Sequence, residues 1–178
     1  MREKRTFAII FALLAVFLAV LPFLVTFNEA LTHLVEKLRL YMWVQERIVP
    51  LEVKMVGVLV SPLGINYLAH QNGMTVNGIY AGMTWNCIGW QSLILFGITL
   101  LVGLQGNFRK SSKIECLVIG ILGTILVNLL RLAAITFLIF NFNAIPATIL
   151  HDYLSAFILI LWLFWFWWFS YSYVLEEV

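Results

Sequence analysis

Four long apolar runs divide the chain and constrain its fold more than any other feature. They cover residues 6–27, 87–104, 114–140 and 153–173, and each is close to the roughly 20 residues that a helix needs to cross a bilayer. Charged residues make up 11% of the chain, against about a quarter in soluble domains. We therefore predict an all-α polytopic membrane protein, with residues 1–178 forming a single membrane-embedded domain of about four transmembrane helices.

The first run follows the basic segment of residues 1–5 and therefore resembles a secretory signal. It is long for a signal, and no small-residue cleavage site is obvious before Asn28. We interpret residues 6–27 as a retained membrane anchor. Removal of this run as a signal peptide is the alternative.

The loop between the second and third runs sets the predicted orientation. Residues 106–113 include three basic residues and no acidic residue, so the positive-inside rule assigns this loop to the cytoplasm. The basic residues before the first run give the same side to the amino terminus, and four spans make the two assignments consistent. The net charge of +2 is small, and the sequence has no nucleic-acid footprint.

The long connection over residues 28–86 is then extracytoplasmic. Its first half has apolar residues at three- and four-residue spacing with nearly balanced charges, which predicts an amphipathic helix along the outer interface. The pair Asn77-Gly78 predicts a tight turn in a short extended hairpin over 72–85. Residues 53–69 are ambiguous, because a fifth crossing there would invert the amino terminus.

Arg131 lies inside the third run with apolar neighbours on both sides. Insertion of Arg near a helix centre costs roughly 2.5 to 3.5 kcal/mol, so such a residue normally faces a polar cavity and marks function. A rise of about 1.5 Å per residue from Ile114 places Arg131 about 25 Å across, towards the outer leaflet. Asn128 shares its helical face and could orient the guanidinium. We expect no acidic residue at this depth, which disfavours a buried structural ion pair.

Cys87 and His151 fall at the external starts of the second and fourth runs. A helix amino terminus stabilises thiolate, the nucleophilic form of cysteine, and an imidazole exchanges protons near neutral pH. Gly89 would let another helix or a substrate backbone approach closely. Asp152 either orients His151 or only caps its helix. A thiol, an imidazole and a guanidinium on one side of the membrane are the groups that thiol acyl transfer requires.

Each of these residues also has a structural interpretation. A single cysteine in a membrane helix is usually a packing residue, and a histidine beside a helix start is often a cap. Cys116 is predicted about a bilayer away from Cys87, so the two cannot form an intramolecular disulfide, and the pattern offers no four-ligand metal site. No cofactor-attachment motif is present. We therefore predict neither a metal nor a cofactor.

At these positions the sequence resembles the exosortase and archaeosortase family of membrane-embedded cysteine transpeptidases. The resemblance covers about residues 53–160, and Ile88 stands where many bacterial members have Ser, so the chain looks more like the compact archaeal branch. The matching motifs, in chain order, are Asn86-Cys87-Ile88-Gly89, Asn128-Leu129-Leu130-Arg131 and His151.

The resemblance implies an enzyme of the plasma membrane with its active site on the extracytoplasmic side. Its substrates would be membrane-anchored precursors whose carboxyl terminus carries a short signature, a transmembrane helix and a basic tail. Cys87 would form a thioester, Arg131 would stabilise the thiolate or oxyanion, and His151 would move the protons. The acceptor would be a lipid amine or another membrane nucleophile.

Two rival functions remain at this point. Simple proteolysis would use the same three residues with water as the second nucleophile. A non-enzymatic transporter or assembly subunit would instead use Arg131 to bind an anion, and it would need neither Cys87 nor an external histidine.

Overall fold

The computed structural model describes residues 32–33, 35–37, 39–142, 144–151 and 155–176. The predicted first span, residues 6–27, therefore lies outside the described residues. The chain divides into two compact units, Met1–Tyr41 and Met42–Val178. The second unit contains every residue of the candidate site that is described.

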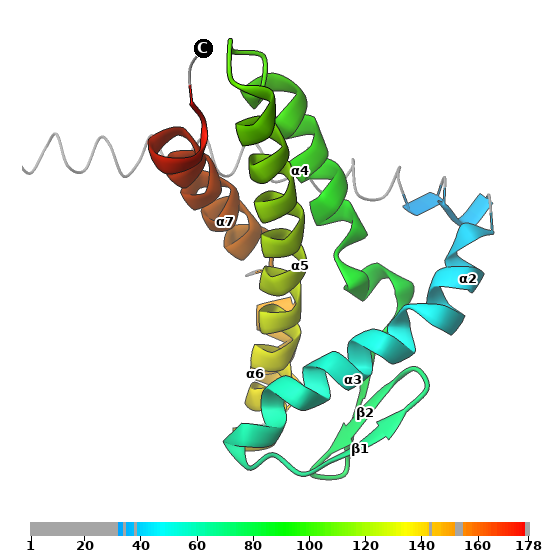
Figure 1. Cartoon of the computed structure of the whole chain (residues 1–178). Helices are drawn as coiled ribbons and strands as arrows, with labels where there is room; N and C mark the ends of the chain where they lie inside the picture. The colour runs from blue at the N-terminus through cyan, green and yellow to red at the C-terminus, as the bar shows by residue number, and fades with distance from the viewer. Residues whose placement is uncertain (1–31, 34, 38, 143, 152–154, 177–178) are drawn as a thin grey trace, which may run out of the picture. The chain divides into compact units, whose positions relative to one another are not determined.

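The second unit is mostly helical and contains one small sheet (Figure 1). Its elements in chain order are α2 (Leu40–Arg47, which begins just before the unit), α3 (Val49–Val60), the 3-10 turn η1 (Ser61–Leu63), β1 (Tyr67–His70), β2 (Gly73–Val76), β3 (Ile79–Gly82), the 3-10 turn η2 (Trp85–Ile88), α4 (Trp90–Gly103), α5 (Lys110–Asn141), α6 (Ala144–Ile149), α7 (Ser155–Phe169) and the π-helical turn η4 (Ser170–Val174).

Among the described residues, three helical stretches are long and apolar enough to cross a membrane, namely Trp85–Gly103, Lys110–Asn141 and Phe157–Val174. They confirm the helices predicted for the second, third and fourth apolar runs. The stretch over α5 has 32 residues, which corresponds to about 48 Å of helix. It is therefore longer than the roughly 30 Å hydrocarbon core, so part of α5 extends beyond the core and can pack against other elements there.

Residues 53–69 form no helix that is long enough to be a fifth crossing. The 12 residues of α3 extend over only about 18 Å. The helix passes into η1 at Pro62, and Gly64 follows with a φ of 72° that ends the helical path. The end of the segment lies in strand β1, which the sequence interpretation missed.

The predicted hairpin is confirmed by the antiparallel pairing of β2 with β3. Asn77 and Gly78 both have positive φ, 50° and 77°, as a type I′ turn requires. Strand β1 adds to the other edge of β2 and gives the order β1-β2-β3. The all-α prediction is thus corrected to a mostly helical fold with a three-stranded sheet.

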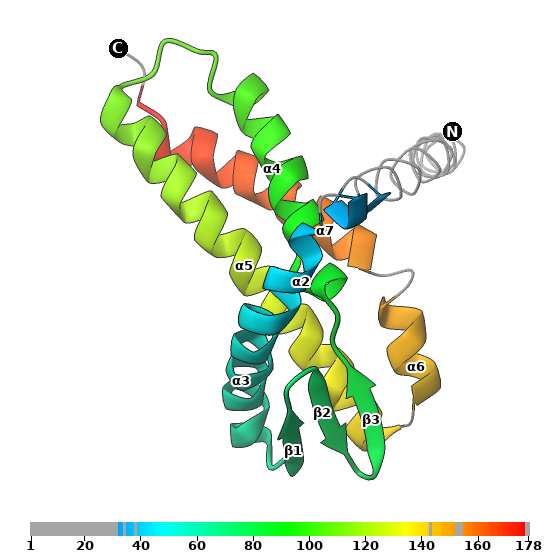
Figure 2. The ribbon, with the colours of Figure 1, turned by 90° about the vertical axis from the view of Figure 1, so that its right-hand side faces the viewer.

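A first core cluster holds α3 and the sheet against the second half of α5. Figure 2 shows α3 beside β1. The turn of the hairpin contacts the end of α5, where Asn77 Nδ2 donates a hydrogen bond of 2.9 Å to the Phe140 carbonyl. The buried members come from all three parts, and they include Val49, Val53, Val56, Val60, Met74, Val76, Leu129, Leu132 and Ile139.

A second core cluster lies where α4, α5 and α7 meet, and it contains Phe96, Leu100, Cys116 and Phe166. Gly120 of α5 permits this packing, because a Cβ atom there would overlap the ring of Phe96. All four members carry apolar side chains or a thiol, so this cluster offers packing and little else. The first cluster packs on the second half of α5 and the second cluster on its first half.

Candidate functional site

Cys87 is positioned by a short segment that links the sheet to α4. The side chain of Gln45 accepts a hydrogen bond from the backbone N–H of Trp85 (2.8 Å) and donates to the Met83 carbonyl (3.3 Å). The Cys87 N–H then donates to the Thr84 carbonyl over 2.8 Å. Cys87 therefore lies on the 3-10 turn η2, just before α4, near the start of the helical stretch Trp85–Gly103, where the sequence placed it.

The structure brings the Cys87 thiol and the His151 imidazole together. The Sγ atom lies 3.9 Å from Nε2 of His151 and 3.7 Å from Oγ1 of Thr84. The Cys87 residue is 7% exposed, whereas His151 is exposed. The pair therefore has one buried nucleophilic atom and one proton carrier that faces the surroundings.

Arg131 and Asn128 both bind the backbone carbonyl of Cys87. The Asn128 Nδ2 atom donates to this oxygen over 2.9 Å, and Arg131 Nη2 donates to it over 3.1 Å. Their separation of three residues on α5 places the two side chains on one helical face, as predicted. In this structure the guanidinium thus holds the backbone of Cys87, and its Nε atom is buried with no partner among the described residues.

Glu52 of α3 is a site residue that the sequence interpretation missed. Its Oε1 accepts a hydrogen bond of 2.9 Å from Asn128 Nδ2, and the residue is only 7% exposed. The expectation that no acidic residue lies at the depth of Arg131 is therefore wrong. A sequence signal existed, because Glu52 interrupts the buried stripe that Val49, Val53 and Val56 form on α3.

The surroundings of Glu52 favour the neutral form of its carboxyl group more than water does. Burial is the main cause and a negative charge on Cys87 adds to it, so that the pKa of Glu52 rises from 4.5 to about 7. The guanidinium of Arg131 and the hydrogen bond from Asn128 act in the opposite direction but are weaker. The carboxyl group is therefore able to change its charge near neutral pH.

The supporting residues predicted from sequence have different fates. Gly89 has a φ of 75°, and a Cβ atom there would lie 2.8 Å from Cγ of Asn128, which confirms that the glycine permits close approach of another helix. The amide oxygen of Asn86 accepts from Trp90 and Gln91, each over 3.4 Å, and no contact with the other site residues is recorded for it. Asp152 lies outside the described residues.

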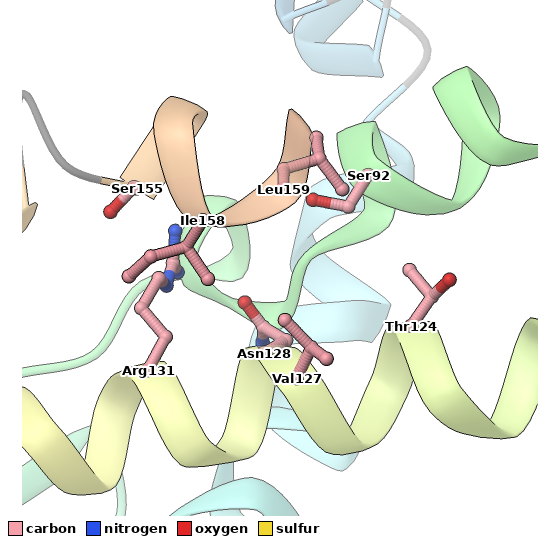
Figure 3. Close-up of a pocket in the computed structure, with 8 residues that line it drawn as sticks. All are labelled: Ser92, Thr124, Val127, Asn128, Arg131, Ser155, Ile158 and Leu159. Atoms are coloured by element: carbon pink, nitrogen blue, oxygen red, sulfur yellow. The ribbon is translucent and has the colours of Figure 1, made fainter. Parts of the chain in front are cut away.

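A small pocket adjoins the site between α4, α5 and α7 (Figure 3). Arg131 and Asn128 form part of its wall, and the remaining lining residues are Ser92, Thr124, Val127, Ser155, Ile158 and Leu159. The polar members come from three helices, and apolar side chains of α7 cover one side. Arg131 thus borders a small cavity that polar and apolar side chains line together.

Within the described part of the chain, no three His, Cys, Asp or Glu side chains lie together in a way that could hold a metal ion. The arrangement instead combines a thiol, an imidazole, a guanidinium and a buried carboxyl group. Comparisons with protein-family models, with curated proteins and with solved structures find no match.

Proposed function

We propose that this chain is a membrane-embedded cysteine transpeptidase that cleaves the carboxyl-terminal sorting signal of secreted precursors. The observation that carries the proposal is the 3.9 Å approach of the Cys87 thiol to the His151 imidazole, with Arg131 bound to the carbonyl of the same cysteine. These residues are far apart in the sequence. Packing alone requires neither a histidine at the cysteine nor an arginine within an apolar helix.

In the first half of the reaction His151 takes the thiol proton, and the Cys87 sulfur attacks the scissile carbonyl carbon. A C–S bond forms, and the carbonyl oxygen becomes an oxyanion that Arg131 stabilises with the N–H that has no other partner. The C–N bond then breaks while His151 gives its proton to the leaving amine. The product is a thioester between the precursor and Cys87.

In the second half an acceptor amine or hydroxyl gives its proton to His151 and attacks the thioester carbon. The C–S bond breaks, the sulfur leaves as thiolate and is protonated again, and the precursor is joined to the acceptor. Hydrolysis follows the same steps with water as the nucleophile. The resemblance to exosortases and archaeosortases favours transfer to a lipid amine or another membrane acceptor.

The distance between the site and the basic loop before α5 supports the orientation that we propose. Twenty-one residues separate Lys110 from Arg131, which is about 32 Å along a helix and matches a hydrocarbon core of roughly 30 Å. With the loop in the cytoplasm, Cys87 lies on the extracytoplasmic side of the plasma membrane. The proposal counts the three candidate spans of the described residues, together with the anchor that the sequence predicts over residues 6–27, as the crossings of a multi-pass protein.

The direct test compares Cys87→Ala with Cys116→Ala in reconstituted membranes that contain a candidate precursor. This precursor ends in a transmembrane helix and a basic tail. We expect Cys116→Ala to cleave it and to form an acyl adduct that neutral hydroxylamine releases. We expect Cys87→Ala to do neither. Full processing of the precursor by the Cys87→Ala protein would contradict the proposal.

The mass of the released precursor separates transfer from hydrolysis. Transfer adds the mass of the acceptor to the new carboxyl terminus, whereas hydrolysis adds only water. An Arg131→Lys protein separates both from the anion-binding alternative, since a lysine retains the positive charge but lacks the planar fork of donors. Retained function in that variant, together with a dispensable Cys87, would support the non-enzymatic function.

A further inference from the structure

Glu52 has no part in the reaction steps described above, although it lies within the site. It is a carboxyl group on a short helix, 7% exposed, and no salt bridge is recorded for it. Burial of an acidic residue is costly unless its contacts compensate. The contacts of Glu52 must therefore compensate for the cost of its burial.

The contacts of Glu52 determine how Asn128 is oriented. A carboxyl oxygen without a proton can only accept hydrogen bonds, so Oε1 of Glu52 obliges Asn128 to present its NH₂ group and not its carbonyl. The second hydrogen of the same Nδ2 atom is then directed to the Cys87 carbonyl, 2.9 Å away. A reversed amide would place two oxygen atoms together at both contacts.

The position of the Cys87 carbonyl in turn bears on that of the thiol. This oxygen accepts from Asn128 and Arg131, while the Cys87 N–H is held by the Thr84 carbonyl. Both sides of the cysteine backbone are thus fixed, and Sγ projects towards His151 from a rigid base. Loss of the Asn128 contact would leave Arg131 as the sole donor to that carbonyl among the recorded hydrogen bonds.

We propose that Glu52 is a positioning residue of the site, whose carboxyl group orients Asn128 and thereby fixes the Cys87 carbonyl so that the thiol faces His151. The proposal deepens the proposed function and rests on it for its biological meaning. The carboxyl group retains this role in both charge states, because Oε1 accepts from Asn128 while Oε2, which has no recorded partner, carries the proton or remains ionised.

The test measures how fast N-ethylmaleimide labels Cys87 in full-length protein in micelles. A Cys116→Ala background leaves Cys87 as the single cysteine, since the chain has two. Glu52→Gln keeps an oxygen acceptor for Asn128, Glu52→Leu removes it, and Glu46→Leu on the exposed surface of α2 is the matched control. We expect Glu52→Leu to slow labelling at pH 7 by at least about tenfold, because small misplacements of a reacting group can cost up to about a hundredfold.

The conservative variant separates positioning from mere bulk. We expect Glu52→Gln and Glu46→Leu to label within about twofold of the parent chain, since the hydrogen bond to Asn128 is retained or untouched. Slow labelling of a folded Glu52→Gln protein would overturn the proposal. Fast labelling of Glu52→Leu would overturn it as well.

A second measurement covers the case in which Glu52→Leu does not fold. Asn128→Ala breaks the same link from the other side and should slow labelling of Cys87 to the same extent. Where both single variants fold, the double variant should be no slower than either one, because the two residues act in series. An unchanged rate in Asn128→Ala, or fully additive losses in the double variant, would contradict the proposal.

Labelling of Cys116 in a Cys87→Ala background reports whether the fold is intact. It should remain slow in each Glu52 variant, and a parallel rise would indicate general loosening and overturn the specific role of Glu52. Labelling does not require a precursor, so failure of the positioning proposal is distinguishable from failure of the proposed function. The latter is decided by whether Cys87→Ala still processes a precursor.

Discussion

The two cysteines of this chain lie at opposite ends of the second unit, and their surroundings differ in kind. Cys116 is fully buried in the second core cluster beside Phe96, Leu100 and Phe166. Cys87 is also buried, at 7% exposed, but its thiol approaches His151 and its carbonyl is bound by polar side chains. Burial alone therefore does not distinguish a packing thiol from a candidate nucleophile.

The difference lies in which groups are buried together with each thiol. At the Cys116 end the members of the core cluster are aromatic and aliphatic, and the Ser170 hydroxyl is the polar group beside the thiol. At the Cys87 end α3 and the sheet bring a carboxyl group against α5, and α5 contributes an amide and a guanidinium. The small outer elements thus supply what the long apolar helices alone would not.

The largest expected effect follows from replacing His151, the histidine that lies beside Cys87. His151→Gln should lower the initial rate of precursor cleavage by about 10² to 10⁴, the usual contribution of a general acid and base. His70→Gln is the matched control, because His70 is exposed on β1 and contacts Thr75. The rate is measured in reconstituted vesicles, and an unaltered rate in His151→Gln would remove the functional distinction between the two cysteines.

The buried carboxyl group predicts a pH dependence of stability that belongs to the Cys87 end alone. The folded-state pKa of Glu52 is raised from 4.5 to about 7, so its contribution is fully present below about pH 4.5. That contribution is lost as the pH rises to about 7 and is then constant, with a total change of at most about 3 kcal/mol.

Glu52→Gln should remove this dependence and be more stable than the parent chain at pH 8. Thermal unfolding of both proteins in the same detergent between pH 4 and pH 8 provides the measurement. Glu46→Gln, at an exposed position, should retain the parent curve. Parallel curves for the parent chain and Glu52→Gln would mean that the pKa of the carboxyl group is the same in the folded and unfolded protein, and the two ends would then differ less than we infer.

Direct comparison of the two thiols gives the next effect in size. At pH 7, N-ethylmaleimide should label Cys87 on the order of a hundredfold faster than Cys116 when each is the only cysteine, because an adjacent imidazole favours the reactive thiolate. Unfolding the protein in denaturant should abolish the difference. Equal rates in the folded protein would show that the environment of Cys87 does not activate it.

Much of the helical architecture could be predicted from sequence because apolar runs report length and composition directly. The runs over 87–104, 114–140 and 153–173 coincide with the helical spans, and Asn77-Gly78 fixed the hairpin turn through its backbone requirements. Strand β1 was missed because its four residues gain their stability by pairing with β2, which no local pattern in 53–69 indicates.

The site was predicted in part, for a similar reason. Cys87, Arg131 and His151 stand out because polar groups are rare in apolar helices, and the structure does bring them together. Glu52 was missed because its partner Asn128 lies 76 residues away, and its place within the apolar stripe of α3 does not by itself mark a site. Only the packing of α3 against α5 makes it a buried site residue.

The smallest expected effect concerns Gly89, which lies between η2 and α4 and faces the Asn128 side chain of α5. Gly89→Ala meets both a φ of 75° and the Asn128 side chain, and the left-handed conformation alone costs about 1 to 2 kcal/mol. Gly97→Ala on α4 is the control, since nothing lies within 4 Å of its Cβ position and alanine is the better helix former by about 1 kcal/mol.

The two glycine substitutions should therefore change the thermal stability in opposite directions. Gly89→Ala should in addition slow the labelling of Cys87, because it displaces the amide that holds the cysteine carbonyl. A loss of stability with an unchanged labelling rate would mean that Arg131 alone is sufficient to hold this carbonyl. In that case the position of Cys87 would depend on the Arg131 guanidinium, and the amide of Asn128 would serve only to pack α5 against η2.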